Sequence, residues 1–415
     1  MEEKKLFAYV GTWPALLRGA IPGFQATKGA TDTIKTGIFG FSVDSKTGDW
    51  KPTGEFFTSS MTSEICLSHD RRFLYSNDED RNRMGVQYAG GGILAFSIDH
   101  ATGQLRFLNE QSSMGTSPTY VETDATGRYA FLANLGNPHD KFVKVIRTDD
   151  GHFEMTTEEE EGSVAMFRTL EDGTLTAAID IVGAQSIDPE GLQGHFSHHH
   201  CVKVDPSNNF LLSCDTNDKI HVFKIDHDNG KLIPADRPFF ETRPGTAPRT
   251  LLFHPGGSWF FVNNQNNSTV YSFSFDSKTG AIEELDYASA VFNGEDATKS
   301  WTSDMAISPK GNYLYVSNRS LGKLMPKVKC PPSTIATFHI DQQTGKLTLK
   351  AVTPVDADPP RGIAFAPGSN FLYVTGMDFN AIYRYDADPE TGALTSPAIV
   401  ANVPVPSSIK FLAVD

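Results

Sequence analysis

Three consecutive histidines, His198 to His200, are the residues of this chain best suited to acid–base chemistry. Side chains alternate between the two faces of a β-strand, so His198 and His200 would share one face and His199 would point the other way. One imidazole of that pair could serve as a general base or bind a substrate by hydrogen bonds. A zinc ion would need a third ligand, such as Asp215 or Glu190, and we expect no metal site.

Three arginines come from separate parts of the chain, namely Arg249, Arg319 and Arg361. The net charge is −14, from 50 acidic and 36 basic residues, so arginines gathered at one place would be unusual for this protein. Guanidinium groups bind carboxylates and phosphates, and they stabilise an oxyanion as it develops. The alternative is that each arginine pairs with an acidic neighbour and only ties neighbouring segments together.

Further polar residues stand at the ends of short β-rich segments. We expect Asp215 to orient a histidine, beside His198, His200 and the three arginines as catalytic candidates. We expect the remaining polar residues to contact the substrate, namely Glu79, Asn134, Asn264, Gln265, Asp304 and Asn318. The chain has no Gly-x-Ser-x-Gly elbow, phosphate loop, dinucleotide fingerprint or His-Glu-x-x-His motif, so we expect no cofactor.

These candidates belong to a cassette of about fifty residues that occurs seven times. Each copy contains an aromatic segment with strand-forming residues, followed by an alternating segment that ends in a glycine turn. The aromatic segments are residues 6–11, 73–77, 129–134, 210–215, 259–264, 313–318 and 371–376. Such repeats predict four-stranded antiparallel blades. The sequence therefore predicts an all-β, seven-bladed β-propeller, formed as a single domain by residues 1–415.

A third type of segment stands just upstream of six of the aromatic segments. A seventh copy, Pro406–Val414, stands at the end of the chain with no aromatic segment after it, whereas residues 6–11 have no such partner upstream. We therefore expect the C-terminal strand to be the innermost strand of the N-terminal blade. This pairing would close the ring and remove two exposed strand edges.

The long insertions also follow a pattern. They either follow an aromatic segment or precede an innermost strand, and they are residues 13–36, 80–91, 135–161, 182–196 and 320–333. In a meander of this order, these positions lie on one face of the disc, near its axis. Long loops commonly carry function, so we expect an axial pocket on this face. We expect the acidic run 158–161 to be part of a solvated loop.

Composition excludes several functions. The acidic net charge argues against binding nucleic acid or an anionic membrane. No apolar run approaches the roughly 20 residues of a membrane span, and the first strand begins almost immediately, which leaves no room for a signal peptide. The cysteines are scattered, and Cys201 and Cys214 could approach one another, but reduced thiols are expected. We expect a cytoplasmic protein.

Five motifs of this chain resemble those of the seven-bladed propeller lactonase family. That family includes a bacterial type of 6-phosphogluconolactonase and the fungal 3-carboxy-cis,cis-muconate lactonising enzyme. The motifs are Tyr9-Val10-Gly11-Thr12, Ser197-His198-His199-His200, Ala247-Pro248-Arg249-Thr250 before His254-Pro255, Tyr315 to Arg319, and Pro360-Arg361. They occur in the family's order over essentially the whole chain. The resemblance implies the propeller fold and chemistry on a lactone.

Departures from the family bear on the mechanism. The family often has Asn-Glu where this chain has Asn264-Gln265, and that glutamate is a proposed acid–base residue of the cycloisomerising members. A glutamine side chain cannot take a proton, so the role of base moves to a histidine. Thr250 replaces a family histidine and Ser320 the usual glycine, and several loops are longer than usual. These differences imply a diverged substrate, bulkier than a sugar phosphate.

We therefore predict a hydrolase that opens an anionic or polar lactone. His198 or His200 would be the base, and the three arginines would bind a carboxylate or phosphate and stabilise the oxyanion. One alternative is cycloisomerisation of an unsaturated carboxylate. For both enzymes the partner is a small-molecule lactone or carboxylate. Another alternative, from a different class, is a non-catalytic propeller that binds a ligand or a partner.

Overall fold

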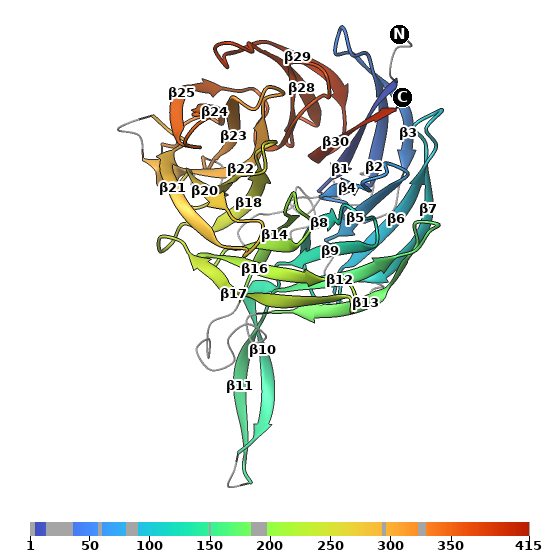
Figure 1. Ribbon diagram of the computed structural model, residues 1–415, viewed down its shortest axis with the longest axis vertical. Helices are drawn as coiled ribbons and strands as arrows, with labels where there is room; N and C mark the ends of the chain where they lie inside the picture. The colour runs from blue at the N-terminus through green and yellow to red at the C-terminus, as the bar shows by residue number, and fades with distance from the viewer. Residues whose placement is uncertain are drawn as a thin grey trace.

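Seven four-stranded antiparallel sheets stand around a common axis as the blades of a propeller (Figure 1). The computed structural model describes residues 5–13, 36–56, 60–79, 90–148, 151–183, 197–292, 296–322 and 329–414. Within these residues the protein is all β, apart from the 3-10 helix η3 (Ala297–Lys299). The predicted seven-bladed fold is confirmed.

Each blade consists of four strands that follow one another outward from the axis. From the innermost strand outward, blade 1 is β30 (Pro406–Val414), β1 (Lys5–Thr12), β2 (Ile38–Val43) and β3 (Trp50–Phe56). In the same order, blade 2 is β4 (Ile65–Leu67), β5 (Phe73–Asp78), β6 (Gly92–Ile98) and β7 (Leu105–Ser112), and blade 3 is β8 (Pro118–Thr123), β9 (Tyr129–Asn134), β12 (Ser163–Thr169) and β13 (Leu175–Val182). Blade 4 is β14 (His199–Val204), β15 (Phe210–Asp215), β16 (Lys219–Asp226) and β17 (Lys231–Glu241), and blade 5 is β18 (Pro248–Phe253), β19 (Trp259–Asn264), β20 (Thr269–Phe275) and β21 (Ile282–Ser289). Blade 6 is β22 (Ser300–Ile307), β23 (Tyr313–Ser320), β24 (Thr334–Ile340) and β25 (Leu347–Pro354), and blade 7 is β26 (Pro360–Phe365), β27 (Phe371–Gly376), β28 (Ala381–Ala387) and β29 (Leu394–Asn402).

Tyrosines of the second strands connect successive blades. The hydroxyl of Tyr9 donates a hydrogen bond to the Gly103 carbonyl in the next blade at 2.9 Å. Equivalent bonds run from Tyr75 to Gly173, from Tyr315 to Gly392, and from Tyr373 to Gly48. Each acceptor is the glycine of a turn and has a positive φ, between 73° and 84°, which glycine adopts without strain. In these four cases, the repeated tyrosine and the repeated turn glycine therefore form one hydrogen bond that joins successive blades.

The C-terminal strand closes the ring, as predicted. β30 pairs antiparallel with β1 along its whole length, from Lys5 to Thr12. It is the innermost strand of blade 1 and contacts the innermost strands of the two neighbouring blades, β26 and β4. In Figure 1 the last strand, in red, accordingly lies beside the first strand, in blue.

One predicted loop is instead a β-hairpin. Within residues 135–161, β10 (Asn137–Arg147) pairs with β11 (Phe153–Glu160) and projects from the ring (Figure 1). The prediction that the acidic run 158–161 lies in a loop was wrong, because its first three residues belong to β11. Strand-forming valines, isoleucine and threonines on both sides of a Gly151 turn favour this hairpin. The insertions at 14–35, 80–89, 184–196 and 323–328 lie outside the described residues.

Two further features of the chain bear on the predictions. All four cysteines are free, although Cys201 and Cys214 are paired positions of β14 and β15. In the part of the chain that the structure describes, no helix has the length and apolar character needed to cross a membrane.

Candidate active site

Except for β4, which pairs with β5 without a shift, the innermost strands share an irregularity near their first residues. At this point the pairing with the second strand shifts, which leaves one or two residues without a pairing partner. Such a β-bulge bends the strand and re-aims the extra side chain. The residues concerned are Thr119, His200, Arg249, Ser303 with Asp304, Arg361 with Gly362, and Ser407.

The second strands satisfy backbone groups at these bulges. The Oδ1 atom of Asn263 accepts the Thr250 amide at 2.9 Å, and the Oγ1 atom of Thr375 accepts the Gly362 amide at 2.8 Å. Ser317 accepts the Asp304 amide at 3.0 Å in the same way. A buried amide without an acceptor is costly. A polar residue near the end of the second strand thus supports the bulge beside it.

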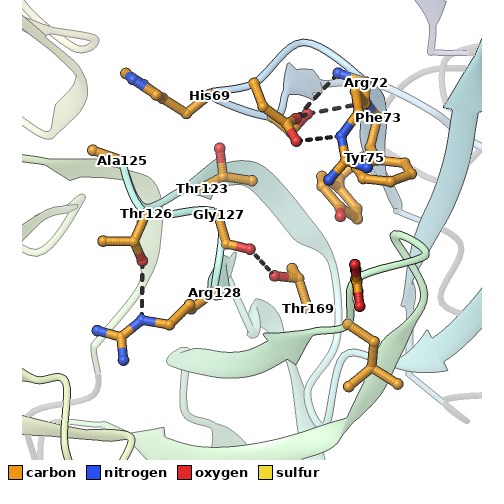
Figure 2. Close-up of a pocket in the computed structure, with 14 residues that line it drawn as sticks. His69, Arg72, Phe73, Tyr75, Thr123, Ala125, Thr126, Gly127, Arg128 and Thr169 are labelled. Atoms are coloured by element: carbon orange, nitrogen blue, oxygen red, sulfur yellow. Dashed lines mark hydrogen bonds and ion pairs between the residues drawn. The ribbon is translucent and has the colours of Figure 1, made fainter.

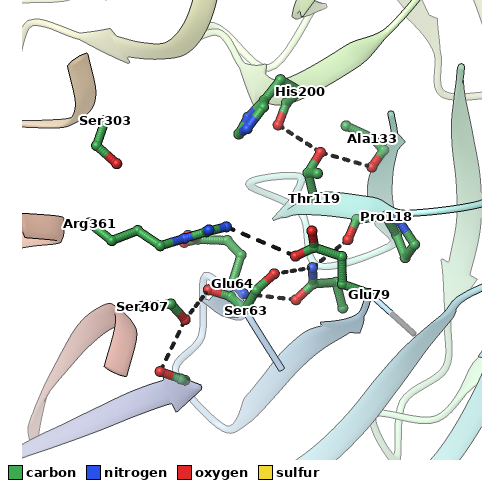
Figure 3. Close-up of polar contacts among 12 residues, drawn as sticks. Ser63, Glu64, Glu79, Pro118, Thr119, Ala133, His200, Ser303, Arg361 and Ser407 are labelled. Atoms are coloured by element: carbon green, nitrogen blue, oxygen red, sulfur yellow. Dashed lines mark hydrogen bonds and ion pairs between the residues drawn. The ribbon is translucent and has the colours of Figure 1, made fainter. Parts of the chain in front are cut away.

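The bulged residues converge on a narrow pocket at the propeller axis. Its walls are Glu64, Thr119, Tyr120, His200, Arg249, Thr250, Asp304, Arg361 and Ser407. Figure 3 shows several of these side chains, from different blades, facing a common space. The cavity volume within the described residues is about 10 Å³, which is the space one water molecule needs.

Arg249 lies in the wall of this pocket, and Arg319 stands beside it, behind the lining residues. The Oε1 atom of Gln265 accepts a hydrogen bond from Arg249 Nε and another from Arg319 Nη2, both at 3.1 Å. Backbone carbonyls are the other acceptors: Ser303 for Arg249, and Thr302 for Arg319 at 3.2 Å. Within the described residues neither guanidinium has a carboxylate at ion-pair distance. Burial lowers the pKa of Arg249 to about 10 and also lowers that of Arg319, and neighbouring arginines lower both further.

Arg361 differs from the other two arginines because a carboxylate lies within ion-pair distance of it. Its Nη2 atom lies 3.9 Å from Glu79 Oε2 (Figure 3), and its guanidinium lies over the Trp13 ring at 4.2 Å. Burial lowers its pKa, while the carboxylates of Glu79, Glu64 and Asp304 act in the opposite direction.

The acidic groups of the pocket are largely engaged by other partners. Glu64 pairs with Lys410 at 2.6 Å, and Asp304 accepts the amides of Met305 and Ile363 at 2.9 and 3.1 Å. Neither Glu64 nor Lys410 was predicted from the sequence. The sequence did contain a signal for both residues: each is a charged residue near or within an innermost strand, among mostly apolar neighbours.

The three histidines occupy three different environments. His200 lines the pocket, and its Nδ1 atom is buried without a hydrogen-bond partner in the described part of the chain. His198 instead bonds through Nδ1 to the Leu135 carbonyl at 2.8 Å, and His199 bonds through Nδ1 to Ser213 at 2.8 Å. Burial, and then the three arginines, hold the pKa of His200 well below its ordinary value. The His200 ring is therefore neutral at pH 7.

Asp215 contacts a histidine that was not among the predicted residues. Its Oδ2 atom lies 3.0 Å from His221 Nε2, and its Oδ1 atom accepts the backbone amide of His198 at 2.8 Å. Burial is the largest influence on the pKa of Asp215 and raises it, but the hydrogen bond and charge of His221, the charge of His199 and the Asn217 amide together hold the pKa below its usual range. The ring of His199 lies 5.0 Å from that of His221. Asp215 therefore orients His221 and fixes the backbone that leads to His200.

Three predicted substrate contacts are buried within the blades. The side-chain amide of Asn134 donates to Ser163 at 3.0 Å, that of Asn264 to Thr269 at 2.9 Å, and that of Asn318 to Thr334 at 3.1 Å. Each bond joins the end of the second strand to the start of the third. None of the three asparagines is in the lining of the axial pocket.

The buried histidine beside this site makes stability depend on pH. Burial, and then His221, lower the pKa of His199 from 6.5 to about 3. Between these values the unfolded chain binds a proton that the folded chain does not, so the free energy of unfolding falls with acidification. The slope is about 1.4 kcal/mol per pH unit for one such group. We expect about 2 kcal/mol less stability at pH 5 than at pH 7.5 from this residue, measured by urea unfolding.

The matched variants are His199→Gln and His69→Gln. The first removes the buried titrating group and should flatten the pH dependence between pH 7.5 and 5, even if its stability is lower throughout. The second changes an exposed histidine and should leave the slope unchanged. An unaltered slope in His199→Gln would contradict this account.

A second pocket lies at the opposite ends of the strands, between turns of blades 2 and 3 (Figure 2). Its volume is about 250 Å³. Its charged groups are paired locally: Arg72 Nε lies 2.6 Å from Asp70 Oδ2, and Arg128 Nε donates to Thr126 at 3.2 Å. None of the residues predicted to be functional lines it. We therefore place the candidate active site at the axis.

The axial residues do not form an evident metal site. Among the residues that the structure describes, no three histidine, cysteine, aspartate or glutamate side chains are grouped so that they could hold a metal ion.

Fold and site together define a β-propeller with a small polar pocket at its axis, lined by two arginines, two carboxylates and a histidine. Residues 26–411 match the family model described as lactonase, 7-bladed beta-propeller. The chain belongs to this seven-bladed β-propeller lactonase family.

Named relatives agree with this assignment. The chain is 24% identical over 410 residues to a 6-phosphogluconolactonase of Bacillus subtilis, covering 98% of this chain and 99% of the relative. It is 28% identical over 363 residues to a 6-phosphogluconolactonase of Formosa agariphila, covering 86% and 90%. A Bacteroides fragilis crystal structure with the provisional name 6-phosphogluconolactonase has a TM-score of 0.74 at 26% identity and covers 98% of both chains. The periplasmic gluconolactonase of Pseudomonas aeruginosa shares the fold, with a TM-score of 0.77 at 23% identity over 99% of this chain and 100% of that one.

Proposed function

We propose that this protein hydrolyses a lactone that carries a carboxylate or a phosphate, with the reacting carbonyl at the mouth of the axial pocket. The observation that carries the proposal is the pair of guanidiniums of Arg249, which is buried, and Arg319, which is half-buried, bonded in the described structure only to uncharged oxygens. The carboxylates of Asp304, Glu64 and Glu79 act on Arg249 from a distance, and a bound anion would supply the direct charged acceptor that both guanidiniums lack in the described residues. Family membership supports the reaction type, and the 6-phosphogluconolactonases among the relatives support the class of ligand.

Hydrolysis needs a base, and His200 is the best placed candidate. Water would give a proton to His200 Nδ1 while its oxygen bonds to the lactone carbonyl carbon, and the carbonyl oxygen would gain negative charge beside Arg249 and Arg319. The ring C–O bond then breaks, and the proton passes from His200 to the leaving oxygen to give a hydroxy acid. The developing oxyanion opposes the arginine charges that lower the pKa of His200, so the imidazole becomes a stronger base as the reaction proceeds.

The size of the pocket constrains how a substrate would bind. A volume of about 10 Å³ holds a water-sized group and excludes a lactone ring. The attacking water or the oxyanion would therefore occupy the narrow part, and the ring would lie outside it. The proposal includes the cytoplasmic location that the sequence predicts, although one structural neighbour is described as periplasmic.

Cycloisomerisation has weaker support. It requires a group that can exchange a proton at the position of Gln265, and an amide side chain cannot do so. In a non-catalytic role, the same arginines would bind an anion without turnover. Only an assay of lactone hydrolysis distinguishes this role from that of a hydrolase.

A lactone panel tests the proposal. The purified protein is assayed, above spontaneous hydrolysis, with 6-phosphogluconolactone, neutral gluconolactone and an unsaturated dicarboxylate, with and without a chelator. We expect hydrolysis of the charged lactone and no effect of chelation. Arg249→Ala should lower kcat/KM for the charged lactone by about 10²- to 10³-fold, as for the loss of one oxyanion donor. Arg72→Ala, in the second pocket, is the matched control and should be unchanged.

The other outcomes separate the alternatives. Phosphate binding without turnover of any lactone would favour the binding module. Cyclisation of the unsaturated dicarboxylate, with no lactone hydrolysis, would favour the cycloisomerase.

A further inference from the structure

Gln265 connects the two arginines that lack a carboxylate partner. It follows β19 in blade 5, Arg249 stands in β18 of the same blade, and Arg319 stands in β23 of blade 6. A single oxygen, Gln265 Oε1, accepts hydrogen bonds from both guanidiniums at 3.1 Å. The amide therefore bridges two blades through two cations.

The charge of the bridging oxygen decides how much positive charge of the two guanidiniums is left to attract a ligand. An amide oxygen aligns the two guanidiniums but neutralises neither of them. A carboxylate at the same place would form two charge-assisted hydrogen bonds and cancel one positive charge. The like charges of Arg249 and Arg319 do disfavour each other, which is one reason that the pKa of Arg319 is lowered. A bound anion would reduce this repulsion between the two guanidiniums.

The guanidiniums also retain bonding capacity. Within the described residues, Arg319 Nε is buried and has no hydrogen-bond acceptor. A buried donor that belongs to a cation and lacks an acceptor is costly, and an anionic oxygen is the partner that would satisfy it. The nearby carboxylates have other partners as placed: Glu64 pairs with Lys410, Glu79 lies beside Arg361, and Asp304 accepts the amides of Met305 and Ile363.

We infer that Gln265 is a positioning and specificity-determining residue, which holds Arg249 and Arg319 together and leaves both charges available to the substrate. It makes the site select a lactone with a carboxylate or phosphate over a neutral lactone. This inference rests on the proposed lactonase function for its substrate, but the binding of anions tests it independently.

The experiment compares Gln265→Glu, Gln265→Met and Asn266→Asp. The first keeps the shape and adds a charge between the guanidiniums, and the second keeps a neutral side chain but removes the acceptor. The third is the matched control, because it adds a carboxylate at the next, exposed residue. Each protein is titrated with inorganic phosphate by calorimetry, and kcat and KM are measured for 6-phosphogluconolactone and gluconolactone.

Gln265→Glu should weaken phosphate binding by about tenfold or more, because the added charge opposes the bound anion at close range. The ratio of kcat/KM for the charged lactone to that for the neutral lactone should fall by a similar factor. Asn266→Asp should change both quantities less than threefold, since solvent screens an exposed charge. Unchanged or tighter phosphate binding in Gln265→Glu would overturn the inference.

Gln265→Met keeps the inference testable if the glutamate variant does not fold. Losing the bridging oxygen should lower kcat for the charged lactone by about tenfold, because the donors lose their alignment. Wild-type kinetics in this variant would overturn the inference. If wild-type protein binds phosphate but hydrolyses no lactone, the proposed function fails while the phosphate titrations still decide the role of Gln265.

Discussion

Removal of residues 405–415 is expected to leave a protein that is insoluble or melts far below the full-length chain. The deletion removes β30, which pairs with β1 along its whole length and contacts the innermost strands of blades 2 and 7. Ile409 and Leu412 are almost completely buried, and each contributes about 1.5–3 kcal/mol by burial. A domain is stable by only about 5–15 kcal/mol, so loss of a whole inner strand exceeds what the remaining fold can tolerate.

Graded variants separate strand loss from a general effect of shortening the chain. Deleting Asp415 alone should leave the melting temperature unchanged, because this residue follows the end of β30. Leu412→Ala should cost about 2–5 kcal/mol and give an intermediate melting temperature. A protein without residues 405–415 that is soluble and melts like the full chain would refute the closure of the ring by β30.

His200→Ala is expected to lower kcat for the charged lactone by about 10²- to 10⁴-fold, as for the loss of a general base. Of the three histidines, His200 alone lines the axial pocket, and its Nδ1 atom has no bonding partner in the described residues. KM should change little, because binding depends mainly on the arginines. The measurement is steady-state kinetics over the pH range in which the protein stays folded.

His198→Ala is the matched comparison. His198 stands two residues away, and its ring bonds to the Leu135 carbonyl, so its removal should reduce kcat by about tenfold or less. If His198→Ala loses activity and His200→Ala does not, the base is His198 and the geometry of the pocket changes when substrate binds. If both variants retain activity, a histidine base is excluded and the site acts through its arginines alone.

The second strands show how much of this fold is predictable. Residues 129–134, 210–215, 259–264 and 371–376 were predicted as strands, and they are β9, β15, β19 and β27. Alternating aromatic and β-branched residues with glycine turns specify such strands locally, in each repeat separately. The hairpin of β10 and β11 was missed because its acidic run suggested a solvated loop, although strand pairing does not require a buried face.

The bulges show where local patterns fail. Strict alternation placed His198 and His200 on one face, but the pairing shift between His199 and Cys201 gives each histidine separate surroundings. A bulge is a property of two paired strands, so the sequence of one strand does not reveal it. The polar residues that support the bulges, such as Asn263 and Thr375, become recognisable only once the pairing is known.

The repeated pattern along the chain was enough to predict the seven blades and the closure by the last strand, because periodicity and turn chemistry recur in every cassette. Which charges meet depends instead on the assembled propeller. Glu64 pairs with Lys410, Asp215 with His221, and Gln265 with two arginines, whereas Arg249 and Arg319 have no carboxylate partner in the described chain. Glu64 with Lys410 and Gln265 with Arg319 join different blades, whereas Asp215 with His221 joins neighbouring strands of one blade, and each pair depends on distances of a few ångströms between strands. Such distances result from the packing of all seven blades at once, and no local pattern encodes them.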